Sequence, residues 1–190
     1  MILFFDTETT GIPRNYNAPV NDVDNWPRLV QIGWILYDSQ DIAEMIEMVI
    51  IPDGFEIPEV ASAVHGLTTA TATETGIDLQ ACLTLFTAAC AKADAIAGHN
   101  VSFDLNVIGA EYVRCGLPIP TEGKRIIDTM KESTAFCAIP GPYGNKWPKL
   151  HELYLKLFEQ DMGHAHTALA DIQNTAKCYF KLSELGVFTA

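Results

Sequence analysis

Hydrophobic residues cluster in three stretches near the N-terminus and predict three β-strands. Residues 1–6 contain a continuous apolar run, which is typical of a strand buried on both faces. Residues 28–38 and 42–51 are rich in apolar and β-branched residues, and the polar residues at 38–41 predict a turn between them. The segment 11–27 is rich in Asn, Asp and Pro, so we expect a loop there. Three strands this close in sequence indicate a meander.

Helical and strand patterns alternate in the rest of the chain. The expected elements are helices over 79–93, 103–116, 148–158 and 167–185 and short strands within 94–100 and 124–129. Together they predict an α/β fold in which a mixed sheet, built from a three-strand meander followed by helix–strand units, is flanked by helices. The chain has no internal repeat or linker, so we expect one domain over residues 1–190.

Composition places the chain among globular proteins. Its 190 residues are 48% hydrophobic and 19% charged, which is enough apolar material to bury a core. The N-terminus has no cationic leader, and no apolar stretch approaches the roughly 18 residues that a membrane span requires. The five cysteines include no C-x-x-C pair, which favours a reducing compartment. We therefore expect a cytoplasmic protein that does not enter a membrane.

The formal net charge of −12 argues against a basic face for gripping long nucleic acid. It leaves a small-molecule substrate, a protein partner, or a site in which bound metal ions supply the positive charge. Solubility alone is the simplest interpretation unless a site is present.

Two carboxylates follow the first predicted strand. Asp6 and Glu8 are two positions apart on an extended chain, so their side chains point to the same face. Acids at the carboxyl end of a buried strand lie where open α/β sheets place ligands. The alternative is a solvated strand end at which Thr9 or Thr10 caps a turn.

Three further residues carry candidate chemistry. Asp104 lies at the start of a predicted helix, where acids complement the helix dipole and Ser102 is a candidate N-cap, so a structural role is a strong alternative. His166 precedes the last predicted helix, where capping or surface exposure is the more common role of a lone histidine. Asp171 lies among apolar residues, and a buried charge there requires a cation nearby.

The order and spacing of these residues resemble a known family. The segments are Asp-x-Glu-Thr-Thr-Gly at 6–11, His-Asn-x-x-Phe-Asp at 99–104 and His-x-x-x-x-Asp at 166–171. They resemble the three motifs of the DnaQ-like 3′-to-5′ exonucleases, the histidine-containing branch of the DEDD superfamily with an RNase H-like fold. The resemblance covers essentially the whole chain.

The resemblance implies a pair of divalent metal ions, Mg²⁺ or Mn²⁺, and a catalytic set. It assigns the metals to Asp6, Glu8, Asp104 and Asp171, with His166 as general base. It also implies substrate contacts from Thr7, Thr9, Ile12, His65, Asn100 and Phe103. The residue types suit this chemistry, because hard Mg²⁺ prefers carboxylate oxygen and two metals can activate water and relieve charge during phosphodiester hydrolysis. The negative net charge is then compatible with a nucleic-acid substrate, because bound metal ions rather than lysines would contact the scissile phosphate.

Three features outside the motifs have open roles. The insertion-like loop within 13–27 gives no functional indication. Residues 140–149 bring together Tyr143, Lys146, Trp147 and Lys149. These side chains suit a stacking and phosphate-holding patch for single strands, but Trp147 suits equally a hydrophobic staple for the next helix. Asp128 is expected to be a structural acid rather than a metal ligand.

The predicted function is a metal-dependent 3′-to-5′ exonuclease that releases nucleoside 5′-monophosphates from single-stranded or frayed ends, DNA rather than RNA, in proofreading or repair. Expected partners are the nucleic-acid 3′ ends and a DNA polymerase or another replication or repair protein. The alternatives are an exoribonuclease or oligoribonuclease of the same fold, and a non-catalytic nucleic-acid-binding subunit. The complete set of four acids and His166 argues against the last, because a scaffold has no need of crowded carboxylates.

Overall fold

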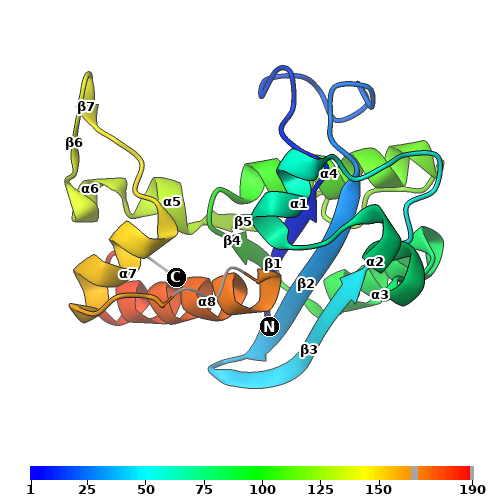
Figure 1. Ribbon diagram of the computed structural model, residues 1–190. Coiled ribbons are helices and arrows are strands. Elements are labelled where there is room, and N and C mark those ends of the chain that lie inside the picture. Colours follow the sequence, from blue (N-terminus) through cyan, green and yellow to red (C-terminus); the bar gives the residue numbers. More distant parts are fainter. Residues whose placement is uncertain (164–166, 189–190) are drawn as a thin grey trace.

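The computed structural model describes residues 1–163 and 167–188 and is built around a five-stranded mixed sheet (Figure 1). The strands lie in the order β3-β2-β1-β4-β5. Their bounds are β1 Ile2–Thr9, β2 Leu29–Asp38, β3 Asp41–Val49, β4 Ala95–Gly98 and β5 Arg125–Asp128. β1, β2 and β3 form an antiparallel meander, and β4 and β5 add to β1 in parallel. The predicted α/β fold class is confirmed.

Helices cover both faces of this sheet, and a small hairpin projects at one side (Figure 1). The helices are α1 Glu59–His65, α2 Thr69–Thr75, α3 Leu79–Lys92, α4 Val101–Arg114, α5 Thr129–Glu132, α6 Thr134–Cys137, α7 Leu150–Phe158 and α8 Ala168–Glu184. The hairpin consists of β6 Pro140–Gly141 and β7 Gly144–Asn145. In the described part of the chain, no helix combines the length and the apolar character that crossing a membrane requires.

Alternation along β1 assigns its side chains to two cores. Leu3 and Phe5 pack in the cluster formed with α3 and α4, whereas Phe4 packs with Ile172 and Ala176 of α8. Successive side chains of a strand point to opposite faces. Asp6 and Glu8 therefore continue the face that α8 covers.

A glycine in β2 sets how closely α8 approaches the sheet. A Cβ atom added at Gly33 would lie 2.9 Å from Ile172 Cδ1 and 3.3 Å from Ala168 Cβ. Such distances are shorter than ordinary van der Waals contact, so a larger residue would require Ile172 to reorient and the start of α8 to move by a few tenths of an ångström. In the β1–β2 ladder, Gly33 pairs with Asp6. The close approach thus occurs directly beside the first carboxylate.

The carboxyl ends of the three parallel strands lie at one edge of the sheet. β1 pairs with β4 through Phe4 and Ala97, and β4 pairs with β5 through Gly98 and Asp128. The strand before Asp104 therefore runs beside the first strand. This edge is where open α/β sheets place ligands.

Several predicted boundaries need correction. The first strand does not end at residue 6 but continues to Thr9, because pairing with β2 extends to Leu29 through an irregularity between Glu8 and Thr9. The helix expected over 103–116 begins at Val101, and its N-cap is Asn100 rather than Ser102.

The sequence patterns also missed α1 and α2. Ala61 of α1 and Ala72 of α2 are buried against Val30 and Ile57, and Thr68 caps α2 by accepting from the Thr71 amide. Two helices of seven residues each, one of them rich in threonine, have weak intrinsic helix preference. Tertiary packing and the cap therefore stabilise them.

Candidate active site

Asp6 and Glu8 project from the end of β1 on the face that α8 covers. Each residue keeps some exposure, as a site open to ligands requires. The alternative interpretation, in which both acids lie at a solvated strand end, does not agree with their burial. Burial is the largest cause of the raised pKa of each carboxyl group. A turn contact is nevertheless present beyond them, since the Thr9 hydroxyl donates a hydrogen bond to the Gly11 carbonyl at 2.7 Å.

Asp104 reaches the same sheet edge from the first turn of α4. Its Oδ1 accepts hydrogen bonds from the Thr7 amide at 3.1 Å and from the Thr7 hydroxyl at 2.6 Å. Both residues are buried. Thr7 points to the opposite face of β1 from Asp6 and Glu8. The strand thus presents two acids on one face and fixes a third from the other.

The chain turns sharply between β4 and α4 to bring Asp104 close. Gly98 is required there, since an added Cβ would lie 2.9 Å from the Val101 side chain and 3.2 Å from the Phe5 carbonyl oxygen. Asn100 adopts a left-handed conformation with φ of 65°, which Asn tolerates better than most residues. Its amide donates to Asp128 Oδ1 at 3.0 Å.

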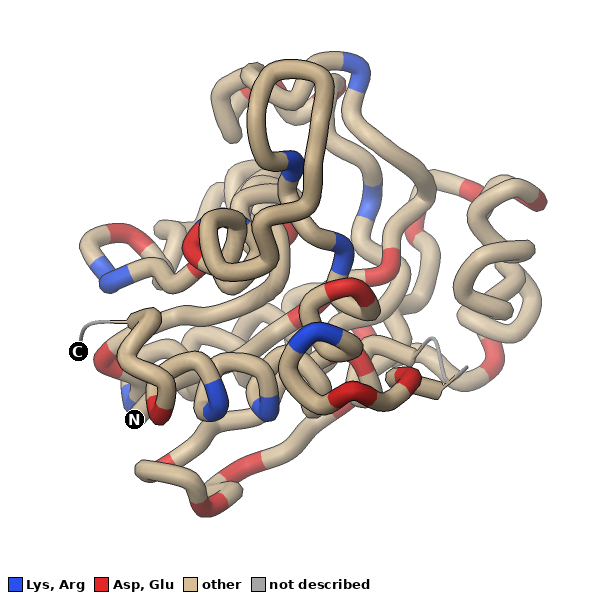
Figure 2. The backbone as a smooth tube through the Cα atoms, turned by 90° about the vertical axis from the view of Figure 1, so that its left-hand side faces the viewer, with Lys and Arg blue, Asp and Glu red and all other residues tan. Residues whose placement is uncertain are grey.

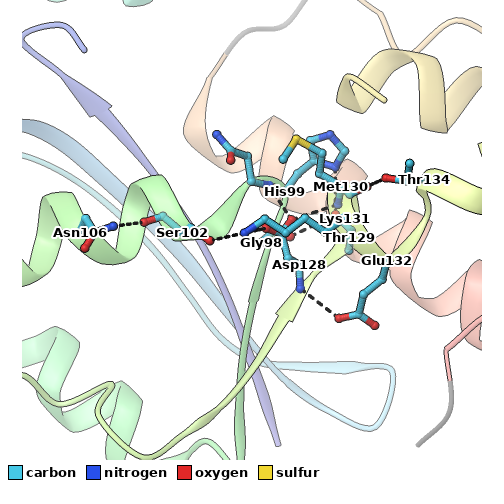
Figure 3. A network of polar contacts seen from close by, with 11 residues as sticks. Gly98, His99, Ser102, Asn106, Asp128, Thr129, Met130, Lys131, Glu132 and Thr134 are labelled. Atoms are coloured by element: carbon cyan, nitrogen blue, oxygen red, sulfur yellow. Dashed lines mark hydrogen bonds and ion pairs between the residues drawn. The ribbon is translucent and has the colours of Figure 1, made fainter. Parts of the chain in front are cut away.

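Asp128 supports this turn as part of a polar network between β4, β5, α4 and α5 (Figure 3). Its Oδ1 also accepts from the Met130 amide, so that it caps α5. On the other side of the turn, His99 donates from Nε2 to the Pro148 carbonyl at 3.0 Å. Burial lowers the pKa of His99, which favours the neutral ring. The structural role expected of Asp128 agrees with these contacts.

Asp171 lies in the first turn of α8. The helix begins at the Thr167 N-cap, whose hydroxyl accepts from the Ala170 amide at 3.2 Å. The Leu169 amide donates to Glu47 Oε1 of β3 at 3.3 Å. These contacts, together with Gly33, fix the start of α8 over the sheet and set Asp171 near Asp6 and Glu8.

The four carboxylates influence one another electrostatically. Burial raises the pKa of Asp6 well above its ordinary value, and the charges of Asp104, Glu8 and Asp171 raise it further. Burial, and then the charges of Asp171 and Glu47, raise the pKa of Glu8 to about 7. Burial raises the pKa of Asp104 to about 7 although the Thr7 hydrogen bonds oppose the increase. Crowded acids with raised pKa values are typical of functional sites.

The four carboxylates are candidate ligands of a divalent cation. Within residues 1–163 and 167–188, no three His, Cys, Asp or Glu side chains are close enough together to make a metal site by themselves. The acids are nonetheless close enough to raise one another's pKa. Hard cations such as Mg²⁺ prefer carboxylate oxygen and retain several waters. Four carboxylates are therefore the type of donor that such a cation takes.

One member of the expected catalytic set falls outside the described residues. His166, expected as the general base, lies in the segment 164–166, which the structure does not describe. In the sequence it directly precedes Thr167, the N-cap of α8.

The expected substrate contacts fall into two groups around the acids. His65, at the end of α1, lies against the Thr9 backbone, and Ile12 is 74% exposed beyond the turn that follows β1. Asn100 and Phe103 lie on the other side, at the start of α4. Thr7 differs from the rest, because its side chain is buried and its hydroxyl donates to Asp104.

Sequence reasoning did not identify Gly33 or Glu47. Both act on α8, which lies more than a hundred residues later in the chain. A glycine inside an otherwise apolar strand pattern was an available signal, because it often marks a close approach of another backbone.

Comparison with known proteins places this geometry in a family. The model of the exonuclease family RNase_T matches residues 3–179. DNA polymerase III PolC-type of Lactococcus lactis subsp. lactis (strain IL1403) is 27% identical over 185 residues, which is 95% of this chain and 10% of that protein. The chain therefore spans about a tenth of that relative.

Solved structures share the fold. Escherichia coli Exonuclease I in complex with a dA16 oligonucleotide superposes with a TM-score of 0.73 at 21% identity, over 96% of this chain and 40% of that one. Exonuclease X in complex with 5′ overhanging duplex DNA superposes with a TM-score of 0.67 at 24% identity, over 100% of this chain and 95% of that one. With the family match over most of its length, the chain belongs to the RNase_T exonuclease family, a DnaQ-like group of the DEDD superfamily with an RNase H-like fold.

Proposed function

We propose that this protein is a metal-dependent 3′-to-5′ exonuclease that releases nucleoside 5′-monophosphates from single-stranded or frayed DNA ends. The observation that carries the proposal is the set of mutually interacting carboxylates that β1, α4 and α8 bring to one sheet edge. Four acids crowded without a cation are unfavourable, and phosphodiester hydrolysis is a reaction for which such a cation site is suited.

Each residue has a defined part in the proposed reaction. Asp6, Glu8, Asp104 and Asp171 hold two divalent ions, Mg²⁺ or Mn²⁺. Bound there, these ions would lower the pKa of a water molecule and offset the charge of the scissile phosphate. His166 takes the proton from the attacking water, because a histidine can accept a proton near neutral pH. Thr7 keeps Asp104 oriented through two hydrogen bonds.

The strand end is held around the turn after β1. The exposed side chain of Ile12 packs against the terminal base, while Thr9 and His65, which lie against each other, contact the terminal nucleotide. Asn100 and Phe103 contact the strand on the α4 side. The scissile phosphate then lies over the carboxylates, between these two groups.

DNA is the favoured substrate, and replication or repair is the favoured setting. The relatives provide the support, since the solved structures of Exonuclease I and Exonuclease X contain DNA and the matched sequence relative is a DNA polymerase. A polymerase or another repair protein is accordingly the proposed partner. An exoribonuclease is the second candidate, because the carboxylate site can act on DNA and on RNA alike. The two polymers are distinguished by contacts to the 2′-hydroxyl.

The test uses end-labelled DNA and RNA oligonucleotides with Mg²⁺, Mn²⁺ or EDTA. The wild type is expected to shorten DNA from the 3′ end in either metal and to stop in EDTA, and a blocked 3′ end is expected to prevent degradation. Asp6→Ala and His166→Ala are expected to lose activity, whereas Glu74→Ala, at an exposed acid of α2, serves as the matched control. Failure to shorten either polymer would favour the non-catalytic subunit, and faster cleavage of RNA would favour the exoribonuclease.

A further inference from the structure

A cavity of about 510 Å³ lies next to the carboxylates, on the side of α4. Two segments whose roles were open form two of its walls: the 13–27 loop through Tyr16 and Trp26, and the 140–149 segment through Trp147. Its lining includes Tyr16, Trp26, Asn100, Phe103, Lys131 and Trp147. The volume is in the usual range for small-molecule sites. Because Asn100 is the N-cap of α4 and Phe103 immediately precedes Asp104, the cavity adjoins the active site.

Two aromatic side chains in this lining are unusually open to solvent. Trp147 is 60% exposed and Tyr16 is 57% exposed. This exposure argues against Trp147 as the staple of α7, because a staple residue packs against the helix that it precedes. The N-terminus of α7 is instead capped by the Glu152 side chain, which accepts a hydrogen bond from the Lys149 amide at 2.8 Å. Large aromatic residues exposed beside a catalytic site indicate a binding surface.

Both walls are held in place without a ligand. Arg114 donates to the carbonyl groups of Val23 and Trp26, and the Trp26 indole donates to the Pro19 carbonyl at 3.1 Å. These contacts anchor the 13–27 loop to α4.

The wall formed by the 140–149 segment is tethered by the bond from His99 Nε2 to the Pro148 carbonyl. The Lys146 amide also donates to the Ile139 carbonyl at 2.9 Å. The cavity is therefore largely preformed, which lowers the entropic cost of binding.

The cavity lining also contains the polar side chains of Ser102, Asn106 and Lys131. Lys131 donates to the Ser102 hydroxyl at 2.8 Å, and Asn106 donates to the Ser102 carbonyl (Figure 3). The Lys131 side chain is 45% exposed, and its Nζ also lies 3.5 Å from Asp128 Oδ2. Amide groups and a cation around aromatic walls suit a nucleobase with its adjacent phosphate.

The scarcity of basic residues in this protein makes a stacking site valuable for binding a nucleic-acid strand. Lys and Arg positions are scattered singly along the chain among more numerous Asp and Glu positions (Figure 2). An acidic protein gains little affinity from phosphate contacts. Stacking of bases on aromatic side chains supplies affinity that does not depend on a basic track.

We propose that this cavity binds an unpaired nucleobase of the substrate strand, upstream of the terminal nucleotide, by stacking on Trp147 and Tyr16. Lys131 contacts the adjoining phosphate. A base can enter only when it is free of its complement, so the cavity selects single-stranded or overhanging ends. This proposal rests on the proposed exonuclease function and adds a specificity-determining subsite to it.

Binding is tested first without cleavage. Of the three tryptophans, Trp34 and Trp26 are buried and Trp147 is exposed. Titration of the protein with a dT oligonucleotide in EDTA is expected to quench tryptophan fluorescence in the wild type and in Tyr143→Ala. Trp147→Phe is expected to lose the quenching. A titration without quenching would overturn the proposal, and so would equal quenching in Trp147→Phe. A peptide of the same net charge as the oligonucleotide is titrated in parallel. Quenching by the peptide and not by the oligonucleotide would also overturn the proposal.

Cleavage separates this subsite from the catalytic centre. The variants Trp147→Ala and Tyr16→Ala are expected to lose about five-fold or more in kcat/KM on oligonucleotides. They should keep wild-type activity on a nitrophenyl ester of thymidine 5′-monophosphate, which has no upstream base. Leu185→Ala, a comparably exposed apolar residue at the end of α8, is the control for both substrates.

The outcomes are distinguishable from failure of the proposed function. Loss on both substrates, or on neither, would overturn the subsite, and so would a loss caused by Tyr143→Ala in place of Tyr16→Ala. A wild type that cleaves neither substrate contradicts the exonuclease function itself, and the fluorescence titration still decides whether the cavity binds a strand.

Discussion

Gly33 of β2 pairs with Asp6 of β1 across the antiparallel ladder, and its missing side chain makes room for α8. The same contact that packs the helix on the sheet therefore determines how far Asp171 lies from Asp6. Packing of the core and assembly of the carboxylates are linked at this one position.

Replacing Gly33 by Ala tests this link. The new Cβ would meet Ile172 Cδ1 at 2.9 Å and Ala168 Cβ at 3.3 Å, so Ile172 must reorient or the start of α8 must shift slightly away from the sheet. Overpacking of this kind costs about 1–3 kcal/mol of stability. We expect a lower urea midpoint and a higher Mg²⁺ concentration for half-maximal nuclease activity. Adding Ile172→Val removes the clashing Cδ1 and is expected to restore part of both; a double variant as impaired as Gly33→Ala would contradict the steric explanation.

Thr7→Val tests the orientation of Asp104. The substitution keeps the shape of the buried side chain but removes the hydroxyl that donates to Oδ1 at 2.6 Å. A hydrogen bond to a charged group is worth about 1.5–3 kcal/mol, and this one opposes the increase in the pKa of Asp104. We expect kcat to fall about ten-fold or more and Mg²⁺ affinity to weaken, measured by metal titration of activity. Thr7→Ser, which retains the donor, should remain close to wild type.

The elements that carry the acids could be predicted because the rules that place them are local. Alternation along an extended strand puts Asp6 and Glu8 on one face, and the helix start at residue 101 puts Asp104 in its first turn. The parallel pairing of β4 with β1 then follows from the helix–strand alternation.

Features that depend on distant contacts could not be read in the same way. Gly33 is meaningful only because α8 packs on it, and α1 and α2 form because Ala61 and Ala72 are buried against β2 and the segment before α1. The cavity between Tyr16 and Trp147 joins segments separated by more than a hundred residues. No local periodicity encodes such an arrangement, so only the folded chain reveals it.

Stability without metal is expected to fall as the pH rises. The pKa values of Glu8 and Asp104 are about 7 in the folded protein, against ordinary values of 4.5 and 3.8. The folded state therefore binds more protons than the unfolded state between these limits, and the stability present below about pH 4 is lost as the pH rises through about 7. Thermal unfolding in EDTA at pH 5 and pH 8 measures this difference.

Two additions sharpen the pH experiment. Mg²⁺ binds the ionised carboxylates, so it is expected to raise the unfolding temperature more at pH 8 than at pH 5. Asp104→Asn removes one of the shifted groups and should flatten the pH dependence. An unfolding temperature in EDTA that rises from pH 5 to pH 8 in the wild type would be evidence against the crowded-acid description.

Glu111 tests how the 13–27 loop is held. This buried carboxylate pairs through Oε1 with Arg28 Nε at 2.9 Å and with Arg114 Nη1 at 3.0 Å. Arg114 in turn anchors the loop that forms one wall of the cavity. Removing one partner of a buried ion pair typically costs about 3–5 kcal/mol. We expect Glu111→Gln to lower the free energy of unfolding by about 3 kcal/mol, measured by urea denaturation, and to weaken oligonucleotide quenching of Trp147.

Glu184→Gln supplies the comparison for Glu111. Its pair with Lys181 at 3.0 Å is exposed to solvent, so its removal should change stability by less than about 1 kcal/mol. Limited proteolysis then locates the effect, because the 13–27 loop should be cleaved faster in Glu111→Gln than in Glu184→Gln. Equal cleavage rates and equal quenching in the two variants would mean that the loop is held independently of the Glu111 pair, by contacts such as the one between the Asn15 amide and Asn25 at 2.8 Å.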